Sequence, residues 1–146
     1  MNILALETAT EACSAALLHT GRTIARFELV PRRHAQRIFP MMDELLAEAA
    51  LTKSQLDAIA VGRGPGAFTG VRLALAIAQG TAFALDRPLI PISSLAALAL
   101  AGAKKHSVVS PGVDILAVLD ARMQEIYVAR FAFDAQGQLL AKSDEQ

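Results

Sequence analysis

Cysteine and net charge are both scarce in this sequence. The single cysteine, Cys13, excludes an internal disulfide and fits a reducing cytoplasm. The 14 basic and 14 acidic residues cancel, whereas a protein that holds a nucleic-acid backbone by itself usually carries a basic excess. We therefore expect any RNA contact to belong to a partner. Only 19% of the residues are charged and 53% are hydrophobic, which excludes an intrinsically disordered chain.

A signal peptide and a membrane span are not expected either. The apolar start Ile3–Leu6 stops at Glu7 and follows no basic residue. The longest apolar stretch lies between Arg72 and Asp86 and is interrupted by Gln79-Gly80, so it falls short of the roughly 20 residues that cross a bilayer. We expect a soluble, cytoplasmic protein with no membrane association.

Residues 1–103 alternate strands and helices in the order β-β-β-α-β-α-β-α. Helical spacing of apolar residues predicts helices over 34–50 and 70–85, with a kink or a fresh start at Pro40 and an N-cap at Thr69. A third helix, capped at Ser93-Ser94, is expected to run to about Ala103. Short apolar strands are expected over residues 3–6, 12–18, 23–30, 57–61 and 89–92. An antiparallel meander followed by parallel additions is typical of a ribonuclease-H-like α/β domain, in which helices flank a five-stranded mixed sheet.

The remaining residues repeat the opening of the chain. After a polar linker over residues 104–112, Ile115–Asp120 matches Ile3–Glu7 as an apolar strand with an acidic end, and a second strand follows. We expect residues 113–146 to begin a second related domain that is truncated. Two such domains in tandem describe the actin, sugar-kinase and Hsp70 superfamily.

Four stretches in this order resemble the TsaB (YeaZ) family, and the resemblance covers the whole chain. They are Ile3–Ser14, Arg33–Ile38 with the following Pro40-Met41, Gly62–Arg72 and Asp120–Tyr127. Glu7 departs from the pattern, because the family usually has Asp there, and this weakens any metal or phosphate chemistry at that turn. Family members also extend well beyond residue 146.

The resemblance implies a non-catalytic scaffold or activator subunit in tRNA modification. In this family the partner TsaD transfers a threonylcarbamoyl group to the adenosine next to the anticodon of tRNAs that read ANN codons. The ATPase TsaE joins the pair, and tRNA is contacted indirectly through the complex. The resemblance implies no cofactor in this chain, with ATP or ADP only at an interface with TsaD or TsaE, and a homodimer when TsaD is absent.

The residues themselves offer no complete catalytic set. His19, His34 and His106 are far apart and match no metal-site spacing. The glycine-rich loop Gly62–Gly70 lacks a Walker lysine, and we interpret it as a loop that brings the following helix close to the sheet rather than as a phosphate cradle. No serine or threonine lies in a nucleophile motif. We predict no catalytic or metal residues and no confident cofactor-binding residues.

Two enzyme hypotheses stay open beside the binding subunit. An ATP-binding enzyme of the actin/sugar-kinase type is suggested by the acidic strand ends Glu7 and Asp120. A peptidase would need a nucleophile or a metal site that the sequence does not supply. Calorimetry with ATP distinguishes the ATP-binding enzyme from the binding subunit, and metal analysis does the same for the peptidase.

Small residues on the second helix favour a protein interface. Gly70, Ala74, Ala78 and Ala82 form one row with a spacing of four, and Ala76, Gly80 and Ala84 form another. One row can pack on the domain's own sheet and leave the other for a partner. By resemblance, the first two helices supply the partner interface, for which the candidates are His34, Met41, Met42, Leu45, Leu46, Arg72, Ala76, Gly80 and Phe83.

Overall fold

The computed structural model describes residues 1–144 as two compact units. The first unit holds Met1–Arg63 and Ala67–Ile92, and the second holds Gly64–Gly66 and the chain from Ser93 onward. Each unit has its own sheet and its own buried apolar cluster.

The first unit is built on a five-stranded mixed sheet in the order β3-β2-β1-β4-β5. Its strands are β1 (Ile3–Glu7), β2 (Ala12–His19), β3 (Arg22–Leu29), β4 (Ala58–Gly62) and β5 (Leu89–Ile92). The first three form an antiparallel meander, and β4 and β5 add in parallel beside β1. This confirms the predicted ribonuclease-H-like arrangement.

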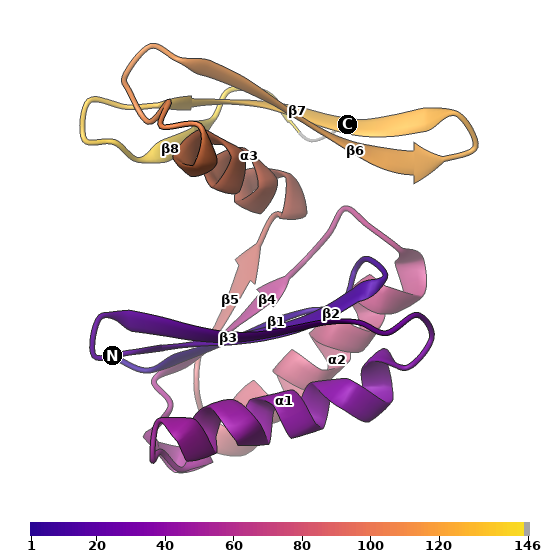
Figure 1. Ribbon diagram of the computed structural model, residues 1–146, viewed down its shortest axis with the longest axis vertical. Helices are drawn as coiled ribbons and strands as arrows, with labels where there is room; N and C mark the ends of the chain where they lie inside the picture. Colours follow the sequence, from indigo (N-terminus) through magenta and orange to yellow (C-terminus); the bar gives the residue numbers. More distant parts are fainter. Residues whose placement is uncertain (145–146) are drawn as a thin grey trace. The chain divides into compact units, whose positions relative to one another are not determined.

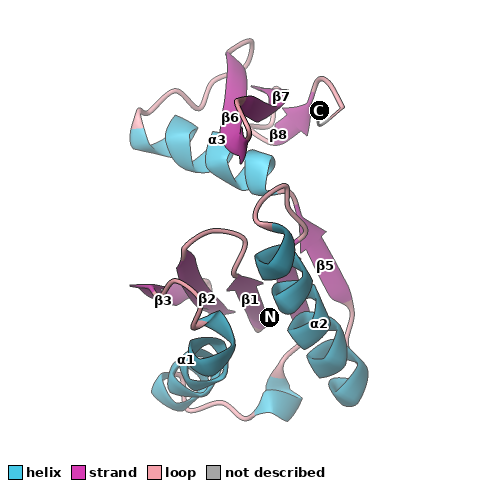
Figure 2. Cartoon of the chain, turned by 90° about the vertical axis from the view of Figure 1, so that its right-hand side faces the viewer, coloured by secondary structure: helices cyan, strands magenta, loops and turns pink. Residues whose placement is uncertain are grey.

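Two helices cover one face of this sheet, α1 (His34–Glu48) and α2 (Phe68–Leu85), as Figures 1 and 2 show. The core between helices and sheet is formed by alternate strand residues and by one stripe of each helix. Its members include Leu4, Leu6, Leu17, Ile59, Val61, Ile38, Met41, Leu45, Ala74 and Ala78. The short 3-10 helix η1 (Lys53–Gln55) precedes β4 and begins with a capping box, in which the Thr52 amide donates to Gln55 Oε1 at 2.8 Å.

The first two helices each differ from the sequence prediction at one point, although α1 begins at His34 as expected. α1 runs through Pro40 as one helix, so no fresh start occurs there. α2 begins at Phe68, and its N-cap position is Ala67 without a side-chain hydrogen bond, so the predicted cap at Thr69 is wrong. The cap predicted for the third helix is confirmed, because Ser93 Oγ accepts from the Ala96 amide at 3.1 Å.

The second unit joins a helix to a three-stranded antiparallel sheet of order β6-β7-β8. Its elements are α3 (Ser94–Lys105), β6 (Asp114–Arg122), β7 (Glu125–Phe133) and β8 (Leu139–Ala141). Leu95 and Ala99 of α3 are buried with Ala129 and Phe131 of this sheet. The predicted domain boundary after residue 103 is therefore displaced: α3 packs in the second core, and the predicted linker, residues 104–112, lies inside the second unit.

Candidate protein-binding surface

The glycine-rich segment before α2 holds that helix tightly against the end of β1. A β-carbon at Gly70 would overlap the Thr8 carbonyl oxygen, and one at Gly62 would overlap the Glu7 carboxylate. The Thr8 hydroxyl donates to the Gly70 carbonyl oxygen at 2.7 Å, and the Ala67 amide donates to the Ala9 carbonyl oxygen at 2.7 Å. These contacts support the interpretation of the loop as a close-packing device rather than a phosphate cradle.

The polar groups near this segment bond mainly to the chain's own backbone. Glu7 Oε1 accepts from the Ala9 amide at 2.6 Å, and His34 Nε2 lies 2.9 Å from the Thr10 carbonyl oxygen. At the opposite end of β1, His19 Nδ1 lies 2.8 Å from the side-chain oxygen Oδ1 of Asn2. Within residues 1–144, no three His, Cys, Asp or Glu side chains gather in a way that could hold a metal ion.

Cys13 does not have the character of a nucleophile. Its side chain is fully buried in the first core. Burial raises the pKa of the Cys13 thiol above its ordinary value, because desolvation disfavours the thiolate. The thiol contributes its packing volume to the core.

The two small-residue rows of α2 have different surroundings. Ala74, Ala78 and Ala82 are buried against the sheet, with exposed fractions of 0%, 0% and 5%. Ala76 and Gly80 of the other row are exposed. A β-carbon at Gly80 would meet nothing within 4 Å, so packing inside the chain does not require glycine there. The structure thus separates a sheet-facing row from a free row.

Large apolar side chains flank the free row. Phe83 is 91% exposed and Phe68 is 70% exposed. A groove of about 470 Å³ runs beside the row, and its walls come from α1, η1 and α2. Its lining residues are Phe39, Lys53, Ala76, Ile77, Gly80, Thr81, Ala84 and Leu85. We call the free row together with this groove the α2 outer face.

The apolar character of α2 also bears on the membrane question. By length and composition alone, Phe68–Leu85 could cross a membrane, and among residues 1–144 no other helix is both as long and as apolar. Core helices of soluble proteins can share this length and composition. Here one side of the helix is packed on a sheet through Ala74, Ala78 and Ala82.

The candidate interface residues divide into two groups. Arg72, Ala76, Gly80 and Phe83 lie together on the exposed side of α2. Four of the five α1 candidates do not reach a surface, because they are buried in the first core. They are Met41, Met42, Leu45 and Leu46, with exposed fractions of 0%, 2%, 0% and 4%.

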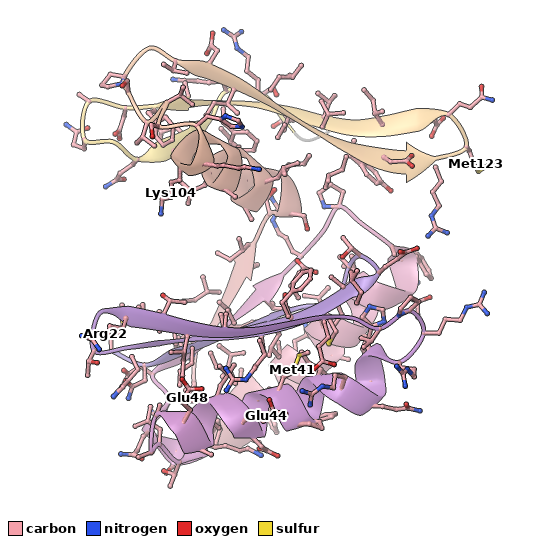
Figure 3. All side chains as sticks on the ribbon, viewed as in Figure 1. Arg22, Met41, Glu44, Glu48, Lys104 and Met123 are labelled. Atoms are coloured by element: carbon pink, nitrogen blue, oxygen red, sulfur yellow. The ribbon has the colours of Figure 1, made fainter. Side chains whose placement is uncertain are left out.

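The assignment of these four α1 residues to an interface is therefore wrong. Met41 points from α1 toward the sheet (Figure 3). The physical reason is that α1 has a single apolar stripe, and this stripe is packed against the sheet. His34 is only partly buried, and its ring bonds to the turn after β1.

Sequence reasoning missed two aromatic residues of this surface. Phe39 is 49% exposed and lies on the groove, and Phe68 stacks with Arg72 at the start of α2. The helical spacing of the sequence indicates where both side chains lie. Phe39 falls outside the stripe of Ile38 and Met42, and Phe68 stands four residues before Arg72, which places the pair on one helix face.

Comparisons with known proteins agree with this arrangement. A protein-family model described as "TsaD: tRNA N6-adenosine threonylcarbamoyltransferase" matches residues 27–143. A Haemophilus influenzae protein named tRNA threonylcarbamoyladenosine biosynthesis protein TsaB is 49% identical over 130 residues, covering 89% of this chain and 53% of that protein. The Escherichia coli protein of the same name is 44% identical over 137 residues, covering 94% and 58%.

A solved structure gives the same result in three dimensions. YeaZ from Pseudomonas aeruginosa superimposes with a TM-score of 0.91 at 47% identity, covering 99% of this chain and 66% of that one. The chain belongs to the TsaB (YeaZ) family. It spans little more than half the length of the two curated relatives, 53% and 58%. The expected resemblance is confirmed, and the α2 outer face is a surface on a member of this family.

Proposed function

We propose that this chain is a non-catalytic scaffold or activator subunit that binds TsaD. In this proposal TsaD transfers a threonylcarbamoyl group to the adenosine next to the anticodon of tRNAs that read ANN codons. The observation that carries the proposal is the α2 outer face, where Ala76, Gly80 and Phe83 leave apolar surface exposed. The pathway is the one in the names of the two curated relatives.

The physical chemistry of the α2 outer face supports protein docking. Full burial of a side chain such as Phe83 contributes about 1.5–3 kcal/mol, and that side chain is 91% exposed in the isolated chain. Ala76 and Gly80 let a second helix approach closely, and the groove beside them accepts larger side chains from that helix. When TsaD is absent, the same face pairs with a second copy.

The reactive groups belong to the partners in this proposal. The acidic residue near the end of each of the strands β1 and β6 accepts a hydrogen bond from the backbone that follows it. Glu7 Oε1 accepts from the Ala9 amide at 2.6 Å, and Asp120 Oδ1 accepts from the Arg122 amide at 2.7 Å. ATP or ADP would bind only where TsaD or TsaE completes a site, and tRNA would be reached through the cytoplasmic complex.

A reconstituted transfer reaction tests the proposal. The purified chain, TsaD and TsaE of the same organism are combined singly and together with the threonylcarbamoyl-adenylate donor and tRNA, and modified adenosine is measured. The chain alone should produce none, and adding it to TsaD should raise the yield. A TsaD preparation that is fully active without the chain would refute the activator role.

Calorimetry tests the competing enzyme hypothesis in the same preparation. ATP with Mg²⁺ is titrated into the chain alone. We expect no binding heat, because the proposal places nucleotide at a shared site. Micromolar binding to the isolated chain would instead favour an ATP-binding enzyme of the actin/sugar-kinase type.

A further inference from the structure

Helix α2 carries one charge, and the groove beside it adds Lys53, which pairs with Asp43 at 2.9 Å. Arg72 is the only charged residue between Phe68 and Leu85, and it lies in line with Ala76 and Gly80 at a spacing of four. Across residues 1–144, no carboxylate lies within ion-pair distance of its guanidinium. By contrast, Arg26 of β3 and Arg37 of α1 each pair with two glutamates.

The Arg72 side chain is held in position by an aromatic ring. Its Cζ lies 3.3 Å from the centroid of the Phe68 ring, well within the range of a cation–π contact. The backbone just before Phe68 is held in place, because the Ala67 amide donates to the Ala9 carbonyl oxygen at 2.7 Å. A guanidinium that stacks on a ring through its face keeps the N–H donors at its edge available for a second group.

We propose that Arg72 is the charged anchor of the α2 outer face, and that the protein docking there presents an aspartate or glutamate carboxylate to it. This inference rests on the proposed function and adds the chemistry of the partner's surface. A planar guanidinium binds a carboxylate through two parallel hydrogen bonds. The Phe68 ring limits the motion of Arg72 beforehand, so less side-chain entropy is lost on binding.

A single cation on α2 that has no carboxylate partner within the chain also sets the register of docking. Small residues at Ala76 and Gly80 would let a partner helix slide by one turn with little change in packing. Such a shift would move the partner's carboxylate from Arg72 to Ala76 and leave it dehydrated without a counter-charge. Arg72 therefore selects one alignment among several that apolar packing alone permits.

The inference commits to a different protein rather than a second copy. α2 contains no acidic residue, so a second α2 has no carboxylate of its own along this face. The nearest in sequence, Asp86, is the residue that ends the helix in a left-handed conformation (φ 52°). An Asp86→Asn variant therefore tests the alternative in which Asp86 of a second copy supplies the carboxylate that pairs with Arg72.

Binding of the variants to TsaD of the same organism tests the inference. The dissociation constant is measured for the full chain at low and high salt. Arg72→Gln should weaken binding by about 30-fold or more, since the partner's carboxylate is left unpaired. Arg72→Lys should recover only part of this loss, because lysine lacks the planar fork. Phe68→Leu should weaken binding by a smaller factor and keep its salt dependence.

Arg87→Gln is the matched control, because Arg87 is exposed, follows the same helix and donates only a weak 3.4 Å hydrogen bond to the Ser54 carbonyl oxygen. It should bind like wild type, and thermal unfolding should be unchanged in Arg72→Gln. If wild type binds TsaD and Arg72→Gln binds equally well, the inference is wrong and the proposed function stands. If wild type does not bind, both are wrong. Weaker self-association in Asp86→Asn, with TsaD binding unaffected by Arg72→Gln, would assign the charge pair to a second copy.

Discussion

The two helices on the first sheet differ in what they bury and what they expose. α1 places Met41, Leu45 and Leu46 in the core and turns charged residues outward, as a surface helix of a self-contained domain does. α2 places alanines in the core and exposes Phe83 and Phe68. Large apolar side chains on the outside and small ones on the inside support the proposal that α2 lies between its own sheet and another protein.

Charge pairing gives the same contrast. On α1 and the neighbouring β3, Arg37 pairs with Glu28 at 2.6 Å and with Glu44 at 2.7 Å, and Arg26 pairs with Glu44 at 3.2 Å and with Glu48. Figure 3 labels Glu44 and Glu48 along this helix. These charges are mutually satisfied within the chain. The single arginine of α2 is stacked on a ring and has no carboxylate partner among residues 1–144.

Truncating one large side chain on each helix should separate their roles. Leu45→Ala on α1 should lower the free energy of unfolding by about 2–5 kcal/mol, because it opens a cavity in the core. Phe83→Ala on α2 should change it by less than about 0.5 kcal/mol, since the ring is 91% exposed. Urea denaturation measures both. Comparable losses in the two variants would mean that Phe83 packs within the chain.

The two glycines of α2 should respond oppositely to alanine. Gly70→Ala places a β-carbon on the Thr8 carbonyl oxygen and should cost about 1–3 kcal/mol of stability. Gly80→Ala enters open space and should stabilise by up to about 1 kcal/mol, because alanine is the better helix former. Thermal unfolding compares the pair. A destabilised Gly80→Ala would show that the free row is occupied within the isolated chain.

A bulky or charged residue on the free row should damage docking without damaging the fold. Ala76→Glu and Gly80→Leu should weaken TsaD binding by on the order of 10-fold or more, because they obstruct close helix approach or bury a charge at the contact. Their unfolding transitions should stay near that of wild type. Ala47→Glu, at an exposed position of α1, is the matched control and should bind normally. Collapse of the fold in the first two variants would place this row in the core.

The sequence predicted the order of strands and helices because hydrophobic periodicity is local and strong in this chain. It could not place α3 in the second unit, because Leu95 and Phe131, which belong to the same buried cluster, are far apart in sequence. The start of α2 was also missed, since it depends on the backbone hydrogen bond from Ala67 to Ala9 rather than on a capping side chain. Local patterns do not report such contacts.

The α2 part of the candidate surface was predictable, because residue spacing along one helix is also a local pattern. The spacing of small residues on α2 separates the sheet-facing row from the free row, and the structure shows which is which. On α1, Met41 and Leu45 were assigned to an interface because the family resemblance points to two helices. Their spacing forms the only apolar stripe of α1, and a single stripe must first cover the sheet.

The charge cluster on α1 gives the smallest effect, and its sign follows from the pKa shifts. Hydrogen bonds from Arg37 lower the pKa values of Glu28 and Glu44 below the ordinary 4.5. A carboxyl group with a lowered folded pKa stabilises the fold above its unfolded pKa, and this contribution is lost as the pH falls through the folded pKa. Arg37→Gln should therefore be less stable than wild type at pH 7, and the gap should close below about pH 4. Denaturation midpoints measured across this range test the prediction, with Lys53→Gln, which removes the exposed pair with Asp43 at 2.9 Å, as the control. A gap that persists unchanged into acid would mean that Arg37 stabilises α1 through packing of its aliphatic stem rather than through its two carboxylate partners.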